Sequence, residues 1–289
     1  MMDPIQEELA ELFRIQLEAD GPDLDAVAET SAPKVGATAE ESVELGRLRL
    51  TANDVDGALA HFRRAQEQAN DPNFAREDIA GALEYGDREA AAFREYERVR
   101  SRGGSTEATV GSAELYRRFG RFKDSVARLE EGAKDAPEDA FVQFKLAQTL
   151  RDSGERTRAL EAGLKALAID PEPAYFHFWV ADLLVEMRRY EESIEHFRAA
   201  LERSPGDDYF CLRSAIAFWG AGRPHDAIRA IGIASELDPD KTLYFGVREM
   251  FLRLNGDSEE ANREAERASR MDAYDRDMLD RIRRELLLA

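Results

Sequence analysis

The sequence predicts an all-α solenoid of about seven stacked helical hairpins, and three residue types that recur at one fixed interval carry the prediction. Prolines stand at Pro137, Pro171, Pro205 and Pro239, each 34 positions after the one before. Glycines keep the same step at Gly120, Gly154, Gly222 and Gly256, with Arg188 in the one vacant place. Alanines follow it at Ala166, Ala200, Ala234 and Ala268. A fixed period of this length is typical of repeats that each bury one face against the next.

Composition and charge narrow the function classes. The chain has 289 residues with 59 acidic and 40 basic side chains, a net charge of −19. That charge disfavours nucleic acid and anionic membrane surfaces as partners. No targeting segment and no run of about 20 apolar residues is visible, so we expect a cytoplasmic protein without membrane insertion. The single cysteine, Cys211, excludes an internal disulfide and a multi-thiolate zinc site.

Residues 1–38 precede the repeats, and residues 4–19 are predicted to form an amphipathic helix. Asp3 can cap this helix, and Pro4 suits its first turn. Its apolar stripe comprises Ile5, Leu9, Leu12, Phe13 and Leu17. Residues 20–38 contain two prolines and two glycines without sustained periodicity and are predicted to be a linker. The helix either caps the first repeat, which the reach of the linker favours, or docks as a tethered peptide in the chain's own groove or in a partner.

One unit, residues 140–173, shows how a repeat is built. Its first half has apolar residues at helical spacing and ends on Gly154, where a left-handed residue can stop a helix. Its second half places Ala159, Gly163 and Ala166 on one stripe, and we expect these small side chains to let the two antiparallel helices approach closely. Asp170 and Pro171 then end the second helix.

These residues resemble the tetratricopeptide repeat family, whose pattern has small residues at repeat positions 8, 20 and 27 and a proline at position 32. In the first repeat Gly46, Ala58, Phe62 and Ala65 match it. The second is one residue short and degenerate. The resemblance divides the chain into repeats 39–72, 73–105, 106–139, 140–173, 174–207, 208–241 and 242–275. It implies a right-handed superhelix whose first helices line a concave groove.

Residues 276–289 are predicted to form a final amphipathic helix. Met278, Ile282 and Leu286 would cover the last repeat while the charged residues face water. Terminal caps of this kind keep a solenoid soluble. The favoured interpretation is therefore a C-terminal capping helix, and the alternative is a homodimer formed through a terminal helix.

The sequence contains no recognisable catalytic or metal site. None of the four histidines forms a zinc-binding pair, and there is no glycine-rich phosphate loop or nucleophile elbow. Cys211 and His177 lie one repeat apart and are the only thiol–imidazole pair to consider for catalysis. Nothing in the sequence supplies the third group that such a pair needs. We therefore predict no catalytic residue, no metal, no cofactor and no enzymatic activity.

The groove is the candidate site. The resemblance points repeat positions 2, 5, 9, 12 and 13 inward, and a bulky residue at position 2 is not required for packing. Buried Tyr and Trp are typical binding anchors. The predicted apolar groove residues are Phe141, Phe144, Tyr175, Phe178, Tyr209, Leu212, Ile216 and Trp219. Arg117, Arg118 and Arg151 add positive charge, unless they only solvate a face or pair with Glu114 and Asp152. Crowding between repeats or the chain's own terminal helix could instead fill the stripe.

The Lys–Asn pair with which chaperone adaptors of this family hold a terminal carboxylate is absent. The predicted function is a non-enzymatic protein–protein interaction scaffold or adaptor that binds a peptide segment of another protein in its concave groove. The alternative is a chaperone or complex-assembly factor that shields apolar segments of several clients. An enzyme subunit has no motif to support it.

Overall fold

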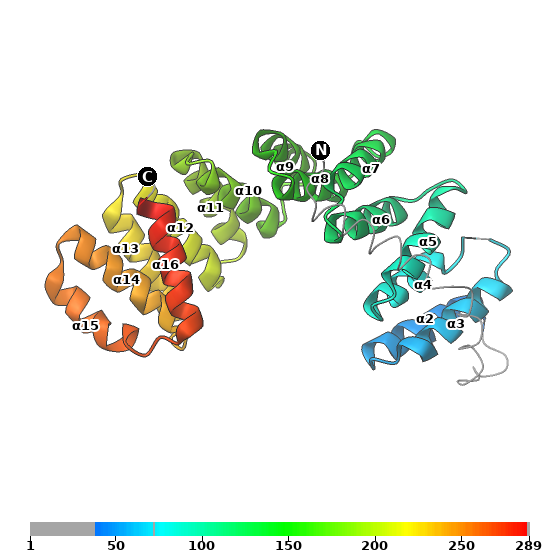
Figure 1. The fold of residues 1–289 in the computed structure, drawn as a ribbon, viewed down its shortest axis with the longest axis horizontal. Helices are drawn as coiled ribbons and strands as arrows, with labels where there is room; N and C mark the ends of the chain where they lie inside the picture. Colours follow the sequence, from blue (N-terminus) through cyan, green and yellow to red (C-terminus); the bar gives the residue numbers. More distant parts are fainter. Residues whose placement is uncertain (1–37, 72, 288–289) are drawn as a thin grey trace. The chain divides into compact units, whose positions relative to one another are not determined.

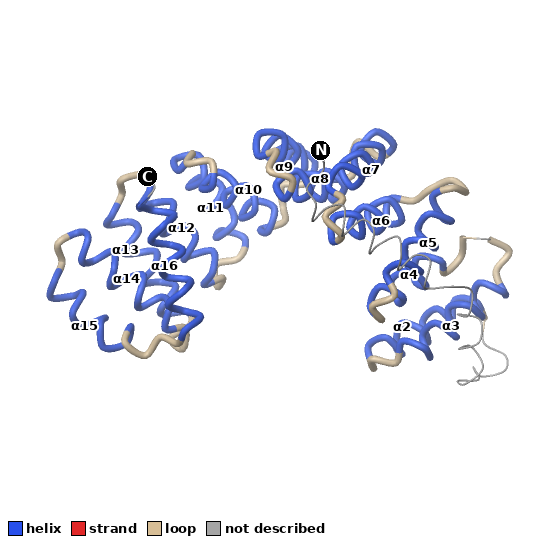
Figure 2. Tube along the Cα trace, viewed as in Figure 1, coloured by secondary structure: helices blue, strands red, loops and turns tan. Residues whose placement is uncertain are grey.

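The computed structural model describes residues 38–71 and 73–287. Within these ranges the chain forms fifteen α-helices and no strand (Figure 2). The prediction of an all-α protein of helix-turn-helix repeats is therefore confirmed. The predicted helix at residues 4–19 and all but the last residue of the predicted linker lie outside the described residues.

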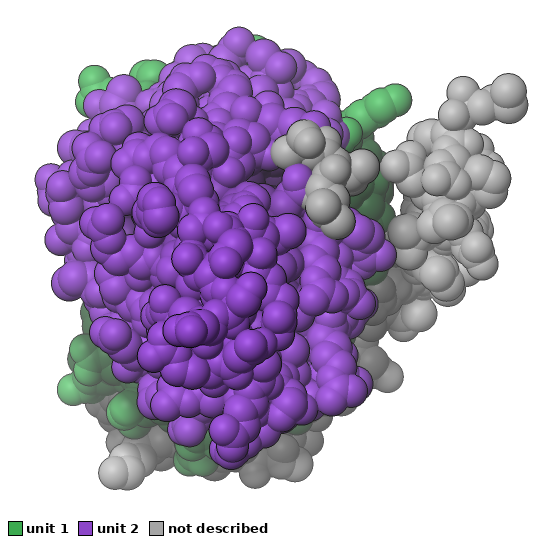
Figure 3. Space-filling model, turned by 90° about the vertical axis from the view of Figure 1, so that its left-hand side faces the viewer, with its two compact units in different colours: residues 1–153 green, residues 154–289 purple. Residues whose placement is uncertain are grey.

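The chain divides into two compact units, residues 1–153 and residues 154–289, which Figure 3 shows in two colours and which we describe separately. The helices of the first unit are α2 (Ala39–Thr51), α3 (Val55–Gln68), α4 (Arg76–Tyr85), α5 (Glu89–Arg100), α6 (Thr106–Arg118), α7 (Phe122–Asp135) and α8 (Ala140–Asp152). Those of the second are α9 (Arg156–Ile169), α10 (Ala174–Glu186), α11 (Tyr190–Arg203), α12 (Asp208–Gly220), α13 (Pro224–Leu237), α14 (Thr242–Asn255), α15 (Ser258–Ala268) and α16 (Ala273–Leu287).

Neighbouring helices pack as hairpins in both units (Figure 1). In the first unit α2 pairs with α3, α4 with α5 and α6 with α7; in the second, α10 pairs with α11, α12 with α13 and α14 with α15. Each second helix also packs against the first helix of the following hairpin, as α11 does on α12. This arrangement buries each repeat between its neighbours, as expected for a stack.

The turn inside each hairpin uses one left-handed residue, at the same repeat position in all seven repeats. Glycine occupies four of these positions, and non-glycine residues occupy the other three, with φ of 59° at Asn53, 57° at Asp87 and 59° at Arg188. The left-handed conformation is strained for an arginine, which has a Cβ and a long side chain. The turn geometry is thus kept where the glycine is not.

Close packing between helices depends on small residues at the contact. A Cβ on Gly46 of α2 would lie 2.4 Å from Phe62 Cε1 of α3, so this glycine lets the two helices of the first hairpin meet. Gly163 of α9 lies close to a helix of the next repeat. A Cβ there would lie 3.0 Å from Val180 Cγ2 and 3.1 Å from Trp179 Cζ3, both on α10. Gly163 therefore admits the first helix of the next repeat.

Polar side chains fix the starts of several first helices. Thr38 and Glu41 form a capping box at α2, in which the Thr38 N–H donates to Glu41 Oε2 at 2.8 Å and the Glu41 N–H donates to Thr38 Oγ1 at 3.2 Å. Ser105 caps α6 and Asp207 caps α12 by accepting backbone hydrogen bonds. These bonds satisfy amide groups that have no partner within the helix.

The last helix, α16, begins three residues before the predicted boundary at 276 and covers more than the last repeat. It packs on α14 of the seventh repeat and also on α12 of the sixth (Figure 1). Leu279 and Ile282 are its fully buried side chains, while Met278 and Leu286 are partly buried. Leu279 was not among the predicted contact residues, and its burial places the apolar side of α16 between Leu279 and Ile282.

Candidate functional site

Three aromatic side chains of the second unit lie next to one another and form a group that we call the aromatic patch. They are Tyr175 and Phe178 on α10 and Tyr209 on α12. The Phe178 ring is next to both tyrosines, with centroid distances of 6.4 Å to Tyr175 and 5.6 Å to Tyr209. Both tyrosines are 50% exposed, whereas Phe178 is buried. The structure therefore brings together these three predicted groove residues and leaves the two outer rings accessible.

The buried base of the patch is held by further aromatic contacts. Phe178 stacks on Phe210 of α12 at 4.3 Å with 10° between the ring planes. It also meets Phe197 of α11 edge-on at 5.9 Å. Stacked and edge-to-face rings in this distance range attract one another beyond the area they bury. Phe178 therefore fixes the spacing of the two tyrosines and has little surface of its own to offer a ligand.

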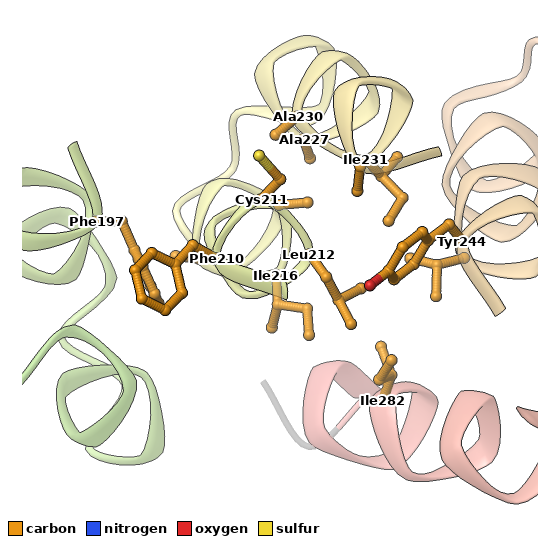
Figure 4. Packing of buried hydrophobic residues seen from close by; sticks show 14 of the residues in the cluster. Phe197, Phe210, Cys211, Leu212, Ile216, Ala227, Ala230, Ile231, Tyr244 and Ile282 are labelled. Carbon is orange, nitrogen blue, oxygen red and sulfur yellow. The ribbon is translucent and has the colours of Figure 1, made fainter. Parts of the chain in front are cut away.

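Of the other three predicted groove residues of this unit, two are buried and Trp219 is partly buried. Leu212 and Ile216 of α12 are buried in the core of the unit, where Figure 4 shows them on the side of α12 that α16 covers. Trp219 stacks on Phe251 of α14, with ring centroids 4.5 Å apart and planes at 5°. Leu212 and Ile216 therefore do not line an open groove, whereas Trp219 is only partly buried.

In the first unit Phe141 and Phe144 occupy the same repeat positions on α8. Phe141 is 50% exposed, and the Lys145 Nζ lies 5.2 Å from its ring centroid. Phe144 is buried, with 3% of its surface exposed. The pairing of an exposed ring at position 2 with a buried ring at position 5 thus recurs on α8 and α10, which lie in different units.

The predicted arginines of the first unit are engaged with acidic neighbours. Arg117 forms ion pairs with Glu114 at 2.8 Å and with Asp152 at 2.5 Å. Burial opposes ionisation of Glu114, but hydrogen bonding from Arg117 and the charge of Lys145 outweigh it and lower the pKa of that carboxyl. Arg117 is therefore paired with Glu114 and Asp152, which was the alternative to a free positive charge in the groove.

Arg118 and Arg151 complete the predicted basic set. Arg118 bridges Glu84 and Glu89, at 2.9 Å from each. Arg151 lies in the last turn of α8. Exposed ion pairs of this kind contribute little stability individually, and they also reduce the positive charge that Arg117 and Arg118 present to a ligand.

Sequence reasoning missed an ion-pair cluster formed by Asp182, Arg213 and Glu285. The Arg213 guanidinium on α12 lies 2.6 Å from Asp182 of α10 and makes two contacts of 3.1 Å with Glu285 of α16. Only 12% of its side chain is exposed. Burial alone would lower the pKa of Arg213, but the two carboxylates overcome this and raise it. A signal was present, because Arg213 is the one charged residue between Phe210 and Gly222, and buried charges need partners.

A second polar group joins the sixth repeat to the seventh. The Tyr244 hydroxyl donates a hydrogen bond to Asp208, whose carboxylate also pairs with Lys241. Burial opposes ionisation of Asp208, yet the bonds from Lys241 and Tyr244 hold the pKa of its carboxyl below the ordinary value. Burial together with the Asp208 charge raises the pKa of the Tyr244 hydroxyl.

The thiol and the imidazole compared in the sequence have separate surroundings. Cys211 is 4% exposed in the core, and burial raises the pKa of its thiol to about 11. His177 Nε2 lies 3.0 Å from the Pro171 carbonyl oxygen, and its ring lies 5.8 Å from that of His196. Burial and then the neighbouring His177 lower the pKa of His196. A buried thiol that remains protonated is a poor nucleophile.

Residues 38–71 and 73–287 contain neither a metal-binding cluster nor a membrane-spanning helix. No cluster of three or more His, Cys, Asp or Glu side chains is suitably placed to bind a metal ion there. None of the helices in these ranges combines the length and the apolar character needed to cross a membrane.

Comparison with known proteins finds a repeat profile that matches part of the chain. A family profile described as tetratricopeptide repeat matches residues 110–172 and 144–208. No curated protein matches the chain in sequence.

Among solved structures, a tetratricopeptide repeat protein from Parabacteroides merdae aligns with 86% of this chain and 98% of its own, at 15% identity and a TM-score of 0.58. YrrB, described as a TPR protein with an unusual peptide-binding site, aligns with 65% of this chain and 97% of its own, at 16% identity and a TM-score of 0.55. A MamA fragment from Desulfovibrio magneticus aligns with 57% of this chain and 93% of its own, at 18% identity and a TM-score of 0.54. At such identities the likeness concerns the fold.

Proposed function

We propose that the chain, of which residues 110–172 and 144–208 match a tetratricopeptide repeat profile, is a non-enzymatic adaptor that binds a peptide segment of another protein through the aromatic patch. The single observation that carries the proposal is the exposure of Tyr175 and Tyr209, 50% for each residue, next to the buried Phe178. Tyrosines offer a large contact area at a low cost in conformational entropy, and they are common binding anchors.

The arrangement of the patch suits an extended apolar or aromatic segment. The two rings come from equivalent positions of successive first helices and project from one rigid base. Positioning by packed helices lets both rings contact a ligand without first being ordered, which lowers the entropic cost of binding. YrrB, which shares the fold, is described as having a peptide-binding site, and this supports the class of ligand without identifying it.

The test selects ligands first and then removes the rings. Peptides are selected from a random display library on the intact chain, and their affinities are compared between the wild type and a Tyr175→Ala, Tyr209→Ala double variant. We expect the double variant to lose at least tenfold in affinity, because each anchor contributes on the order of 1–2 kcal/mol.

Tyr274→Ala is the matched control, because this tyrosine is also exposed but lies on α16. The control variant is expected to bind as the wild type does, and circular dichroism should show equal helical content in all three proteins. Equal affinity of the wild type and the double variant for every selected peptide would refute the proposal.

A further inference from the structure

The C-terminal helix α16 lies where the family resemblance places a ligand. It packs across α12 and α14, the first helices of the sixth and seventh repeats. Ile282 projects from α16 toward Leu212 of α12 and Tyr244 of α14 (Figure 4). Leu212 and Ile216 occupy repeat positions that the resemblance assigns to the groove, and they belong to the same buried cluster as Leu279 and Ile282.

The contact between α16 and the repeats combines a narrow apolar stripe with one buried ionic group. Leu279 and Ile282 are three residues apart, and Glu285 follows after three more, so the three side chains share one side of the helix. Glu285 meets both terminal nitrogens of Arg213, an arrangement that fixes orientation as well as charge.

Four charged side chains of α16 face solvent. Arg281 pairs with Asp277 and Arg283 with Asp280 within the helix, and all four side chains are exposed. An amphipathic helix attached by a few apolar anchors and one carboxylate is how a helical peptide ligand binds to a groove. The helix therefore has the character of a bound ligand that is covalently linked to its own receptor.

The surface covered by α16 continues into the aromatic patch. Tyr209 lies one helical turn before Arg213 on α12. Asp182, which also binds Arg213, is on α10 together with Tyr175 and Phe178. A ligand that extends from the patch along α12 therefore reaches the Arg213 cluster and meets α16 there.

We propose that the face of α12 and α14 beneath α16 is a binding site for an amphipathic helix of a partner protein, and that α16 occupies it until the partner displaces it. The partner helix presents two apolar residues three positions apart and a carboxylate three positions further, the pattern of Leu279, Ile282 and Glu285. This inference deepens the proposed adaptor function and rests on it, because it identifies the chemistry of a segment that the adaptor accepts.

The test uses a fluorescently labelled peptide with the sequence of residues 273–287 as the probe, and fluorescence anisotropy on the full chain as the readout. Ile282→Asp and, separately, Glu285→Gln in the chain weaken the attachment of its own α16 while leaving α12 and α14 unchanged. Both variants are expected to bind the probe at least tenfold more tightly than the wild type does. A probe that itself carries Ile282→Asp should bind none of the proteins.

Arg281→Ala in the chain is the matched control, since Arg281 is on the solvent side of α16. It should bind the probe as weakly as the wild type. The inference is overturned if Ile282→Asp and Glu285→Gln chains keep their helical content and still do not bind the probe. It is equally overturned if both variants unfold, because α16 would then be an inseparable part of the core.

The two proposals fail in different experiments. The double tyrosine variant tests the patch with peptides selected on the wild type, in which α16 is in place. The probe experiment tests the covered face and leaves Tyr175 and Tyr209 intact. A negative result in one of these experiments therefore leaves the result of the other unaffected.

Discussion

The indole of Trp219 lies parallel to the ring of Phe251, with ring centroids 4.5 Å apart and 5° between the planes. The two residues come from α12 and α14, so the stack joins the first helices of the sixth and seventh repeats. Phe251 is fully buried, and Trp219 covers part of its surface. Trp219 is therefore a packing residue between repeats.

Replacing Trp219 by alanine should lower the free energy of unfolding by about 2–3 kcal/mol, because the change removes a large apolar contact and leaves a void against Phe251. Trp219→Phe keeps a ring in the stack and should cost less than about 1.5 kcal/mol. Urea denaturation followed by circular dichroism measures both. Equal losses in the two variants would contradict a role for the stacked ring.

The second prediction concerns the hairpin turn at Arg188, whose φ of 59° is costly for a residue with a side chain. Arg188→Gly should raise the free energy of unfolding by about 0.5–1 kcal/mol, since the relief of strain exceeds the entropy that glycine gains in the unfolded chain. The reverse change at an equivalent turn, Gly222→Ala, should lower it by about 1 kcal/mol. Thermal or urea unfolding that ranks the two variants the other way would show that the turns are not equivalent.

The third prediction is a dependence of stability on pH at Asp208. The pKa of this carboxyl is lower in the folded protein than in the unfolded chain, so its ionised form stabilises the fold. This contribution is fully present above the unfolded pKa of about 4, and it is lost as the pH falls through the folded pKa. Asp208→Asn should therefore cost about 1–2 kcal/mol at pH 7 and progressively less as the pH falls below about 4.

Urea titrations of wild type and Asp208→Asn at several pH values measure this difference. Tyr244→Phe tests the neutral partner of the same group and should also destabilise the protein at pH 7, because it removes the hydrogen bond to Asp208. A difference between wild type and Asp208→Asn that stays constant from pH 7 to pH 3 would contradict the interpretation.

Much of the fold could be predicted from the sequence because the features that define it are local and periodic. Pro171, Pro205 and Pro239 lie in the loops between hairpins, where a missing N–H does no harm. Gly120, Gly154, Gly222 and Gly256 have the left-handed φ that their positions indicated. The three non-glycine residues in the same conformation were harder to foresee, because the neighbouring helices impose it on them.

The candidate site was less accessible to the same reasoning. The periodic pattern places Tyr175 and Tyr209 at equivalent positions, and both are exposed. It gives Leu212 and Ile216 equivalent positions too, but a helix that starts at Ala273 covers them. A non-periodic segment that folds back over two repeats depends on tertiary packing, which a repeat pattern does not encode.

The buried thiol of Cys211 provides a built-in reporter of local opening. It is the chain's only cysteine, and it lies in the cluster that also contains Leu212, Leu279 and Ile282. Burial raises the pKa of its thiol to about 11, which lowers the fraction of reactive thiolate at neutral pH, and burial also excludes the reagent. Alkylation should then proceed only through molecules in which the sixth repeat has separated from its neighbours. The rate of thiol labelling in native buffer therefore measures how often this part of the protein opens, without any engineered probe.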